Sequence, residues 1–155
     1  MHIRKMQKSD FENLKPLFRQ VHNIHSQNRP DVYNDIDPLN RDYFDFLIND
    51  DKTLTLVCEA ENKLVGFCVA TFREPSKNPL LKARNVLFVE NMCVEDSHRQ
   101  KGIGKMMLDE ITQQAKEKGT DVIELTVWSF NDDAIKFYES CGMTFRSFTM
   151  ERHLW

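Results

Sequence analysis

The chain has 155 residues, of which 41% are hydrophobic and 29% charged, and its formal net charge is -3. This length suits one domain with its own core, and the slightly acidic balance argues against a dominant nucleic-acid-binding face, which needs clustered Lys and Arg. No apolar run approaches the roughly 20 residues of a membrane-spanning helix, and the first ten residues lack a signal-peptide core. We therefore expect one domain, residues 1–155, with neither nucleic acid nor membrane as partner.

Cysteine usage indicates the redox compartment. The four cysteines are scattered, and no two are spaced as a CxxC pair: Cys58, Cys68, Cys93 and Cys141. This pattern is typical of reduced thiols that pack as small core residues. We expect a cytoplasmic protein.

The first half begins with a short strand, residues 2–6, followed by a helix. Ser9 and Glu12 have capping-box spacing, and Pro16 predicts that the helix either starts late or kinks. Apolar residues recur at helical spacing: Phe11, Leu14, Leu17, Phe18 and Val21. Residues 27–37 are polar and are expected to form a loop, after which Asp37 and Pro38 predict the N-cap and first turn of a second helix.

The middle of the chain has the patterns of β-strands. Residues 53–59 and 64–72 alternate or run apolar around a turn at Glu61 and Asn62, which predicts a hairpin. Residues 74–81 contain two prolines and are expected to form a second loop. Residues 85–94, rich in Val, Leu and Phe, predict the next strand.

The last third alternates helices and strands. Residues 102–118 have apolar side chains at every fourth position and stop at Gly119, which predicts a helix. A strand over residues 122–128, a short helix over 131–141 closed by Gly142, and a final strand over 144–154 follow. The order β-α-α-β-β-β-α-β-α-β predicts an α/β fold: a mixed, mostly antiparallel sheet with helices on both faces and one right-handed parallel crossover.

A glycine-containing turn between a strand and a helix is the segment that carries chemistry. Gly102 and Gly104 let the backbone bend and approach a ligand, and the helix start offers free N–H groups to a pyrophosphate. Arg99, Lys101 and Lys105 add positive charge. The alternative is a plain turn that needs glycine for geometry alone.

Two common nucleotide-binding motifs do not fit this turn. Met107 stands where the third glycine of a Rossmann fingerprint would be, and no Gly-Lys-Ser/Thr follows as in a P-loop. The segment instead resembles the GNAT superfamily of N-acetyltransferases, whose Arg/Gln-x-x-Gly-x-Gly/Ala pattern Arg99, Gly102 and Gly104 match. A second block matches the family's Asn-x-x-Ala-x-x-Phe-Tyr-x-x-x-Gly-Phe, except that Met143 replaces the last aromatic: Asn131, Ala134, Phe137, Tyr138 and Gly142.

This resemblance implies a GNAT-like fold and an acyltransferase that moves acetyl from acetyl-CoA, its acyl-donor co-substrate, to a primary amine without a metal. The residues that it implies for acetyl-CoA binding are Met92, Cys93, Val94, Arg99, Gln100, Lys101, Gly102, Ile103, Gly104, Lys105, Asn131, Ala134, Phe137 and Tyr138. The four residues of the second block have plainer structural alternatives: Asn131 as an N-cap, and Ala134, Phe137 and Tyr138 as core residues.

The reaction implied is direct attack of a neutral amine on the thioester, with no covalent enzyme intermediate. Tyr138 would protonate the departing thiolate, and the N–H of Val94 would stabilise the developing oxyanion. Glu90, a lone carboxylate in an apolar strand, is the candidate base, with Asn91 as a weaker candidate. We do not expect Cys93 to act as a nucleophile.

The sequence says least about the acceptor amine, which could belong to a small molecule or to a protein. Loops 27–37 and 74–81 are expected to build its site, with Trp128 and Phe130 as an aromatic wall that could equally be core. The acidic loop residues could attract a cation or simply be solvated: Asp31, Asp35, Asp37 and Glu74. Two other classes stay open, a non-catalytic CoA-binding sensor or scaffold and a nucleotide-binding protein, and we also consider a homodimer. His22 and His25 could face one way on their helix, but no third metal ligand is evident.

Overall fold

The computed structural model describes all residues from 1 to 155. Its five strands are β1 (His2–Lys5), β2 (Thr53–Ala60), β3 (Lys63–Arg73), β4 (Val86–Val94) and β5 (Val122–Leu125). Its four α-helices are α1 (Phe11–Asn28), α2 (Arg41–Asn49), α3 (Ile103–Glu117) and α4 (Asp132–Ser140). Short 3-10 turns, η1 (Lys8–Asp10) and η2 (Asp96–His98), precede α1 and α3. No helix is both long and apolar enough to cross a bilayer.

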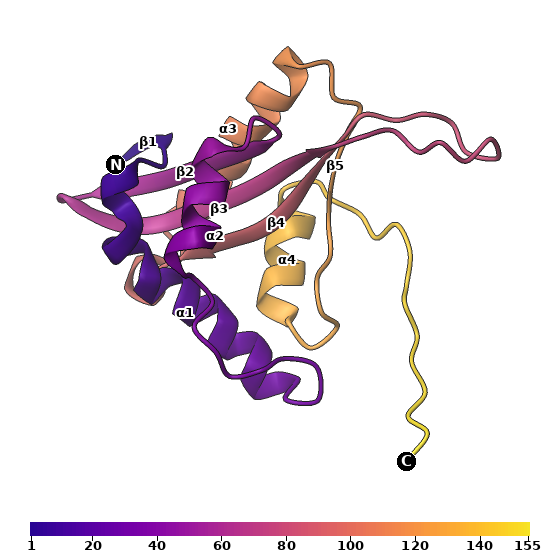
Figure 1. Cartoon of the computed structure of the whole chain (residues 1–155), viewed down its shortest axis with the longest axis horizontal. Helices are drawn as coiled ribbons and strands as arrows, with labels where there is room; N and C mark the ends of the chain where they lie inside the picture. Colours follow the sequence, from indigo (N-terminus) through magenta and orange to yellow (C-terminus); the bar gives the residue numbers. More distant parts are fainter.

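The strands form one sheet in the order β1-β2-β3-β4-β5. Neighbours are antiparallel except β4 and β5, which are parallel and joined through α3. Helices α1 and α2 cover one face and α3 covers the other (Figure 1). The mixed, mostly antiparallel sheet with one parallel crossover is therefore confirmed.

Each face of the sheet has its own apolar core. On one face α1 and α2 pack on the sheet, where the rings of Phe18 and Phe67 stack with centroids 4.1 Å apart. On the other face α3 packs through the side chains that its four-residue spacing predicted: Ile103, Met107, Ile111 and Ala115. Because both faces are covered, β2 and β3 are buried along most of their length, whereas β4 is buried only in part.

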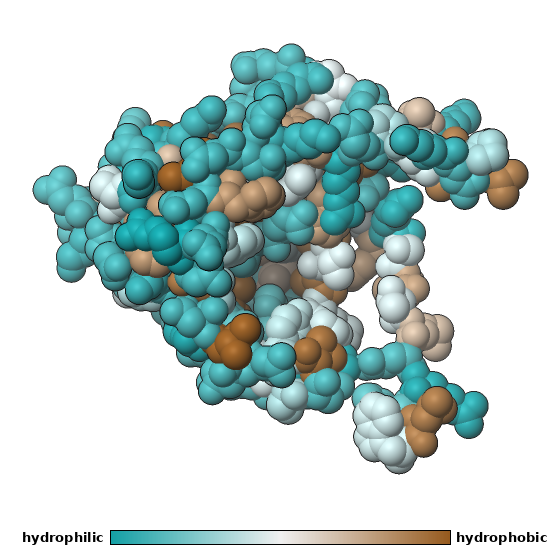
Figure 2. Space-filling view, viewed as in Figure 1, coloured by the Kyte–Doolittle hydropathy of each residue, from teal (hydrophilic) through white to brown (hydrophobic).

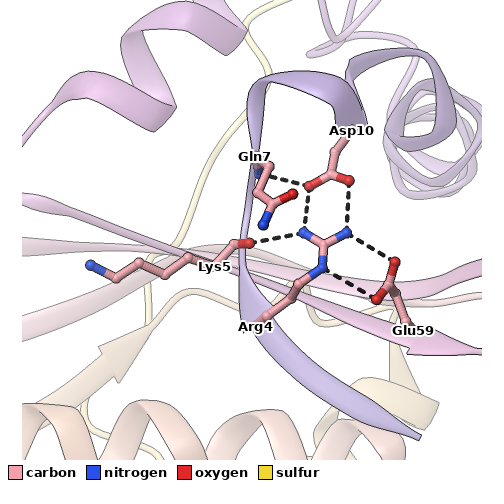
Figure 3. A network of polar contacts seen from close by, with 5 residues as sticks. All are labelled: Arg4, Lys5, Gln7, Asp10 and Glu59. Carbon is pink, nitrogen blue, oxygen red and sulfur yellow. Dashed lines mark hydrogen bonds and ion pairs between the residues drawn. The ribbon is translucent and has the colours of Figure 1, made fainter.

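An ion-pair network ties the first strand to the start of α1 (Figure 3). The guanidinium of Arg4 donates to both carboxylate oxygens of Asp10, at 2.8 and 2.9 Å, and to Glu59 on β2 at 3.0 Å. The backbone N–H of Gln7 also donates to Asp10, at 2.7 Å. Burial alone would raise the pKa of Asp10, but these bonds lower it below its usual value, so the carboxylate stays charged.

Two helix starts differ from the sequence prediction. Ser9 and Glu12 do not form the capping box, because Asp10 takes that role by accepting from Gln7. Helix α1 begins before Pro16, at Phe11, so a late start is wrong. Helix α2 begins at Arg41, where Asn40 accepts from the N–H of Tyr43 at 2.8 Å. Asp37 and Pro38 therefore do not open α2, and Asp37 instead accepts from the N–H of Leu39 within the loop.

The end of the chain differs more. The strand predicted over 122–128 ends at Leu125, because β4 and β5 pair no further than Val89 with Leu125. The strand predicted over 144–154 is absent: residues 144–155, here called the tail, make no backbone–backbone hydrogen bond. In Figure 1 the tail leaves the top of α4 and runs clear of the sheet.

Candidate active site

The turn before α3 has the geometry of an anion-binding site. Gln100 and Gly102 have left-handed φ angles of 61° and 82°, and Gly102 is the N-cap of α3. As a result the N–H groups of residues 100–105 donate to no acceptor in the chain. A side chain at Gly102 would meet nothing within 4 Å, so the turn is open on that side. Free N–H groups at a helix start are what a pyrophosphate binds.

Gly104 is required for a different reason. A Cβ at this position would lie 2.9 Å from the ring of Phe137, on α4. Glycine therefore lets α4 pack directly against the first turn of α3. The two sequence motifs, which are separated along the chain, meet at this contact.

The cations around the turn are exposed and partly paired. Arg99 bonds Asp96 at 3.1 Å, and Lys105 bonds Asp109 at 2.6 Å. Lys101 forms no ion pair. These side chains can turn towards an anion at small cost, because exposed ion pairs are weak.

Next to the turn, β4 and β5 separate and leave part of β4 without a neighbour on one side. Beyond Val89, β4 pairs only with β3, and residues 126–128 pair with no strand. The β3–β4 register also shifts here, since Val69 pairs with Asn91 and Ala70 with Val89. Glu90 is the extra residue of this bulge, which re-aims a side chain beside the opening.

Glu90 and Asn91 line a cavity of about 240 Å³ on the α1 face. The Glu90 carboxylate is 39% exposed and lies 3.8 Å from the guanidinium of Arg73. It is therefore an accessible carboxylate and not a buried one. The other cavity walls come from α1, α2 and the loop between them: Phe18, Val21, His22, His25, Tyr33, Pro38 and Tyr43. Figure 2 shows this face hollowed between α1 and α4.

Beyond the bulge, part of the backbone at the end of β4 is already hydrogen-bonded to a side chain of α1. Gln20 of α1 donates to the carbonyl of Val94 at 2.9 Å and accepts from the N–H of Asp96 at 3.2 Å. Gln20 therefore fixes the end of β4, a role that the sequence did not suggest. Met92 and Val94 pack towards the α3 face, whereas Cys93 is buried on the α1 face. Burial raises the pKa of the Cys93 thiol to about 12, so it is a poor nucleophile near neutral pH.

Helix α4 presents the second motif to the same region. The side chain of Asn131 caps the helix by accepting from the N–H of Ala134 at 3.2 Å. Phe137 and Tyr138 contact each other edge-to-face, with centroids 5.0 Å apart. Burial first, and then the nearby Cys68 and Cys141, raise the pKa of Tyr138 well above its usual value. This raised pKa keeps the Tyr138 hydroxyl protonated near neutral pH.

An aromatic cluster joins the loop after α1 to the end of β5. The indole of Trp128 donates to the hydroxyl of Tyr33 at 2.8 Å, and the ring of His25 stacks on Tyr33 at 5.2 Å. Phe130 stacks on Trp128 with centroids 6.1 Å apart. Tyr33 is also a cavity wall, so the cluster fixes one side of the cavity. The sequence suggested Trp128 and Phe130 but missed Tyr33 and Tyr43, which carry no motif.

Three of the four acidic loop residues form ion pairs with neighbouring cations. Asp31 bonds Arg29 at 2.7 Å, Asp35 bonds Arg19 at 3.4 Å, and Glu74 bonds Lys52 at 2.7 Å. The Arg29 guanidinium holds the pKa of Asp31 at about 2. The 74–81 loop contributes no wall to the cavity and projects away from α1 (Figure 1). Of the two loops, the structure brings only 27–37 to the cavity.

One group of possible metal ligands is present, formed by Asp31, Glu151 and His153. All three are exposed, and both carboxylates bond the same Arg29 side chain at 2.7 Å. This shared partner explains why they lie together.

Comparison with known proteins identifies the class. Residues 18–143 match the model of the acetyltransferase (GNAT) family. The chain belongs to this family, and both sequence motifs lie inside the matched region.

Relatives in sequence carry the same family name. An uncharacterised N-acetyltransferase of Methanocaldococcus jannaschii is 31% identical over 100 residues, 64% of this chain and 43% of that protein. The L-ornithine N5-acetyltransferase NATA1 of Arabidopsis thaliana is 33% identical over 64 residues, 41% of this chain and 28% of that protein. The chain thus spans less than half the length of these two relatives. An N-acetyltransferase of Archaeoglobus fulgidus is 25% identical over 144 residues, 90% of each chain.

Solved structures share the fold. A crystal structure of a mutant of the BH1408 protein from Bacillus halodurans is 32% identical and superposes over 100% of both chains with a TM-score of 0.96. The aminoglycoside N-acetyltransferase AAC(6')-Iy in complex with CoA is 19% identical, covers 98% of this chain and 99% of that one, and has a TM-score of 0.74. At that identity the likeness shows the fold alone.

Proposed function

We propose that the protein transfers the acetyl group of acetyl-CoA to a primary amine. The observation that carries this proposal is the run of free N–H groups over residues 100–105, which opens beside the point where β4 and β5 separate. The turn would hold the pyrophosphate, and the unpaired edge of β4 would lie along the rest of the donor. AAC(6')-Iy, which has the same fold, was crystallised with CoA.

On the acceptor side, Glu90 would remove the proton that blocks attack. An alkylamine has a pKa of about 10.4, so at pH 7 it arrives as a cation that cannot attack a carbonyl. Glu90 faces the cavity as an accessible carboxylate and would accept the proton directly or through a water molecule. The guanidinium of Arg73 keeps a positive charge 3.8 Å from it. The neutral nitrogen would then form a bond to the thioester carbon.

On the donor side, the N–H of Val94 would stabilise the negative charge that develops on the carbonyl oxygen. As the carbon–sulfur bond breaks, Tyr138 would give its hydroxyl proton to the departing thiolate. Its raised pKa keeps that proton available. The products are an N-acetylated amine and CoA with a free thiol, and no bond to the protein is made.

The cavity favours a slender aliphatic amine as acceptor. It combines one carboxylate, Glu90, with the rings of Tyr33, Tyr43 and His25, and it encloses only about 240 Å³. Rings and a carboxylate suit an alkylammonium head group. Burial lowers the pKa of His25, so this wall stays neutral and does not repel a cation. The name of one relative, NATA1, specifies the side-chain amine of ornithine, which has this shape.

We propose the cytoplasm as its compartment, because all four cysteines are free thiols and three of them are buried. Such usage is typical of a reducing environment.

An amine panel tests the proposed function. Purified protein and acetyl-CoA are mixed with polyamines, ornithine, lysine, an aminoglycoside or a peptide with a free α-amine, and release of the CoA thiol is followed. We expect release with aliphatic amines and little with the bulky aminoglycoside. Calorimetry that shows CoA binding without release for any amine would instead support a sensor or scaffold.

A further inference from the structure

Arg73 places a positive charge at the margin of the acceptor cavity. It is the last residue of β3, and its guanidinium lies 3.8 Å from the carboxylate of Glu90. That distance is longer than a hydrogen bond, so this contact leaves the N–H donors of Arg73 free to bond another group. Glu74, the next residue along the chain, bonds Lys52 at 2.7 Å. Arg73 is therefore a half-exposed cation whose hydrogen-bonding capacity Glu90 does not use.

The ring of Phe88 holds this guanidinium on the cavity side of the sheet. Leu87 and Val89 are buried under α3, so the side chain of Phe88 between them points to the opposite face, where Glu90 lines the cavity. The guanidinium carbon of Arg73 lies 3.6 Å from the centre of the Phe88 ring. This cation–π contact restricts the side chain, and a restricted arginine loses less freedom when it binds a carboxylate.

The fixed charges beside the cavity cancel. Glu90 is the one carboxylate among the cavity walls, and Arg73 lies next to it. Burial lowers the pKa of His25 and raises the pKa of Tyr43, so both of these walls stay uncharged. An acceptor that carries only ammonium groups is attracted by Glu90 and repelled by Arg73. An acceptor that carries an ammonium group and a carboxylate is attracted by both.

We propose that the acceptor is an amino acid, whose carboxylate binds Arg73 while its amine meets Glu90. This inference rests on the proposed function and names the class of amine that the same site takes. A guanidinium and a carboxylate can form two parallel N–H···O bonds, which fix the direction of the bound molecule. Because Arg73 is not a wall of the cavity, the carboxylate lies at the margin and the amine lies inside. Polyamines, which lack a carboxylate, are poorer acceptors.

The first test compares amino acids with the amines that remain when the carboxylate is removed. The pairs are ornithine and putrescine, lysine and cadaverine, and norvaline and butylamine, which together cover side-chain amines and α-amines. Release of the CoA thiol gives kcat/KM for each compound. Since charge-assisted hydrogen bonds are the strong ones, we expect kcat/KM to favour the amino acid by about tenfold or more in at least one pair. A preference for the plain amine, or no preference, in every pair overturns the proposal.

Arg73→Gln shows whether Arg73 causes that preference, which a difference in amine pKa could also produce. We expect this variant to lower the ratio of the two kcat/KM values by about tenfold or more, mainly through the KM of the amino acid. If both members of a pair fall by the same factor, Arg73 acts through packing or through Glu90, and the proposal is wrong.

Arg84→Gln is the matched control. Arg84 lies at the other end of the loop that follows β3, and its guanidinium is also 3.8 Å from a carboxylate, that of Glu124. The substitution therefore removes the same charge from the same kind of pair, outside the cavity walls. We expect Arg84→Gln to keep the preference for amino acids. Loss of the preference in both variants would show that general surface charge produces it, and would overturn the proposal.

The second test measures binding without turnover. With free CoA present, calorimetry with ornithine, lysine and norvaline gives a Kd for the unaltered chain and for Arg73→Gln. We expect the Kd to rise by about tenfold or more in the variant. Equal Kd values in the two proteins, or no binding of any of the three amino acids, overturns the proposal.

The two tests separate this inference from the proposed function. If amines with and without a carboxylate release the CoA thiol equally well, acetyl transfer stands and the amino-acid site is wrong. If amino acids bind in a way that depends on Arg73 but no amine causes release, the amino-acid site stands and acetyl transfer is wrong.

Discussion

At the scale of single residues, the structure separates the two proposed proton-transfer groups by face. Glu90 lines the cavity on the α1 face, whereas Tyr138 packs with Phe137, whose ring lies against α3 on the other face. An amine and a thioester that meet where β4 and β5 separate would therefore find a base on one side and an acid on the other. This arrangement suits direct transfer without a covalent enzyme intermediate.

Replacing Tyr138→Phe removes the proton donor and keeps the ring packing. We expect kcat to fall by about 10² to 10⁴, the usual contribution of general acid–base assistance. Because the pKa of Tyr138 is raised, the unaltered enzyme should show no alkaline loss of activity below the ordinary tyrosine value of about 10. Steady-state rates across pH measure both. Ser140→Ala, which removes an exposed hydroxyl from the same helix, is the control. Full turnover of the Tyr138 variant would leave the residue a packing role only.

Replacing Glu90→Gln tests the base. At pH 7 we expect kcat/KM to fall by about 10² or more, because the bound amine keeps its proton. The deficit should shrink as pH rises towards the amine pKa of about 10.4, since more acceptor then arrives neutral. Glu61→Gln, in the exposed β2–β3 turn, is the matched control. A constant deficit at every pH would assign Glu90 to positioning and not to proton transfer.

At the scale of elements, two glycines near the start of α3 do different work. Gly102 takes a left-handed φ beside open space, and Gly104 makes room for Phe137. Gly119, just past the other end of α3, has a φ of 70° and also meets nothing within 4 Å. It shares the backbone geometry of Gly102 and lies outside the proposed site.

This pair gives a controlled test of the CoA site. Gly102→Val and Gly119→Val should both lower stability by about 1–2 kcal/mol, since each forces a branched residue into a left-handed conformation. Only Gly102→Val should weaken CoA binding, by about tenfold or more, which calorimetry measures. Equal CoA affinities in the two variants would place the pyrophosphate elsewhere. Gly104→Val is less informative, because overpacking against Phe137 disturbs α3 and α4 together.

The network that joins β1, η1 and β2 makes a prediction about stability. Arg4→Ala would leave Asp10, only 4% exposed, as a buried charge without its partner, and we expect a loss of about 3 kcal/mol in the free energy of unfolding at pH 7. The folded-state pKa values of Asp10 and Glu59 are lowered, so this stabilisation is complete above their unfolded values of about 4. It disappears as pH falls through the folded values, and the two proteins should then converge.

Urea unfolding at pH 7 and at acid pH measures this difference. Lys52→Ala, which breaks the exposed pair with Glu74, should change the free energy of unfolding little at either pH, because exposed ion pairs are weak. An Arg4→Ala deficit that is just as large in acid would show that packing, and not charge, is what Arg4 supplies.

At the scale of the whole molecule, the sequence predicted what local patterns determine. The four-residue apolar spacing of α3, the hairpin turn at Glu61 and Asn62, and the two GNAT motifs all depend on residues close in sequence. The bulge at Glu90 could not be predicted, because a bulge is a property of register between strands. Tyr33 and Trp128 are 95 residues apart, and no sequence pattern predicts the hydrogen bond between them.

The tail shows the same limit most clearly. Its composition favours a strand, and the prediction of a strand within the chain's own sheet is wrong. A strand forms only where another strand offers an edge, and here β5 is reached only by a side chain, that of Arg146. A pattern within one segment does not report whether such an edge lies within backbone hydrogen-bonding distance.

The most direct test of the central claim is the balance of products. Protein, acetyl-CoA and a slender aliphatic amine are incubated, and mass spectrometry quantifies N-acetylated amine and free CoA in the same sample. The account predicts equal amounts of both, formed only when the amine is present and depressed together in the Tyr138→Phe variant. Free CoA that forms without acetylated amine, or at a rate that does not depend on the amine concentration, would contradict acetyl transfer. Either result would identify thioester hydrolysis instead.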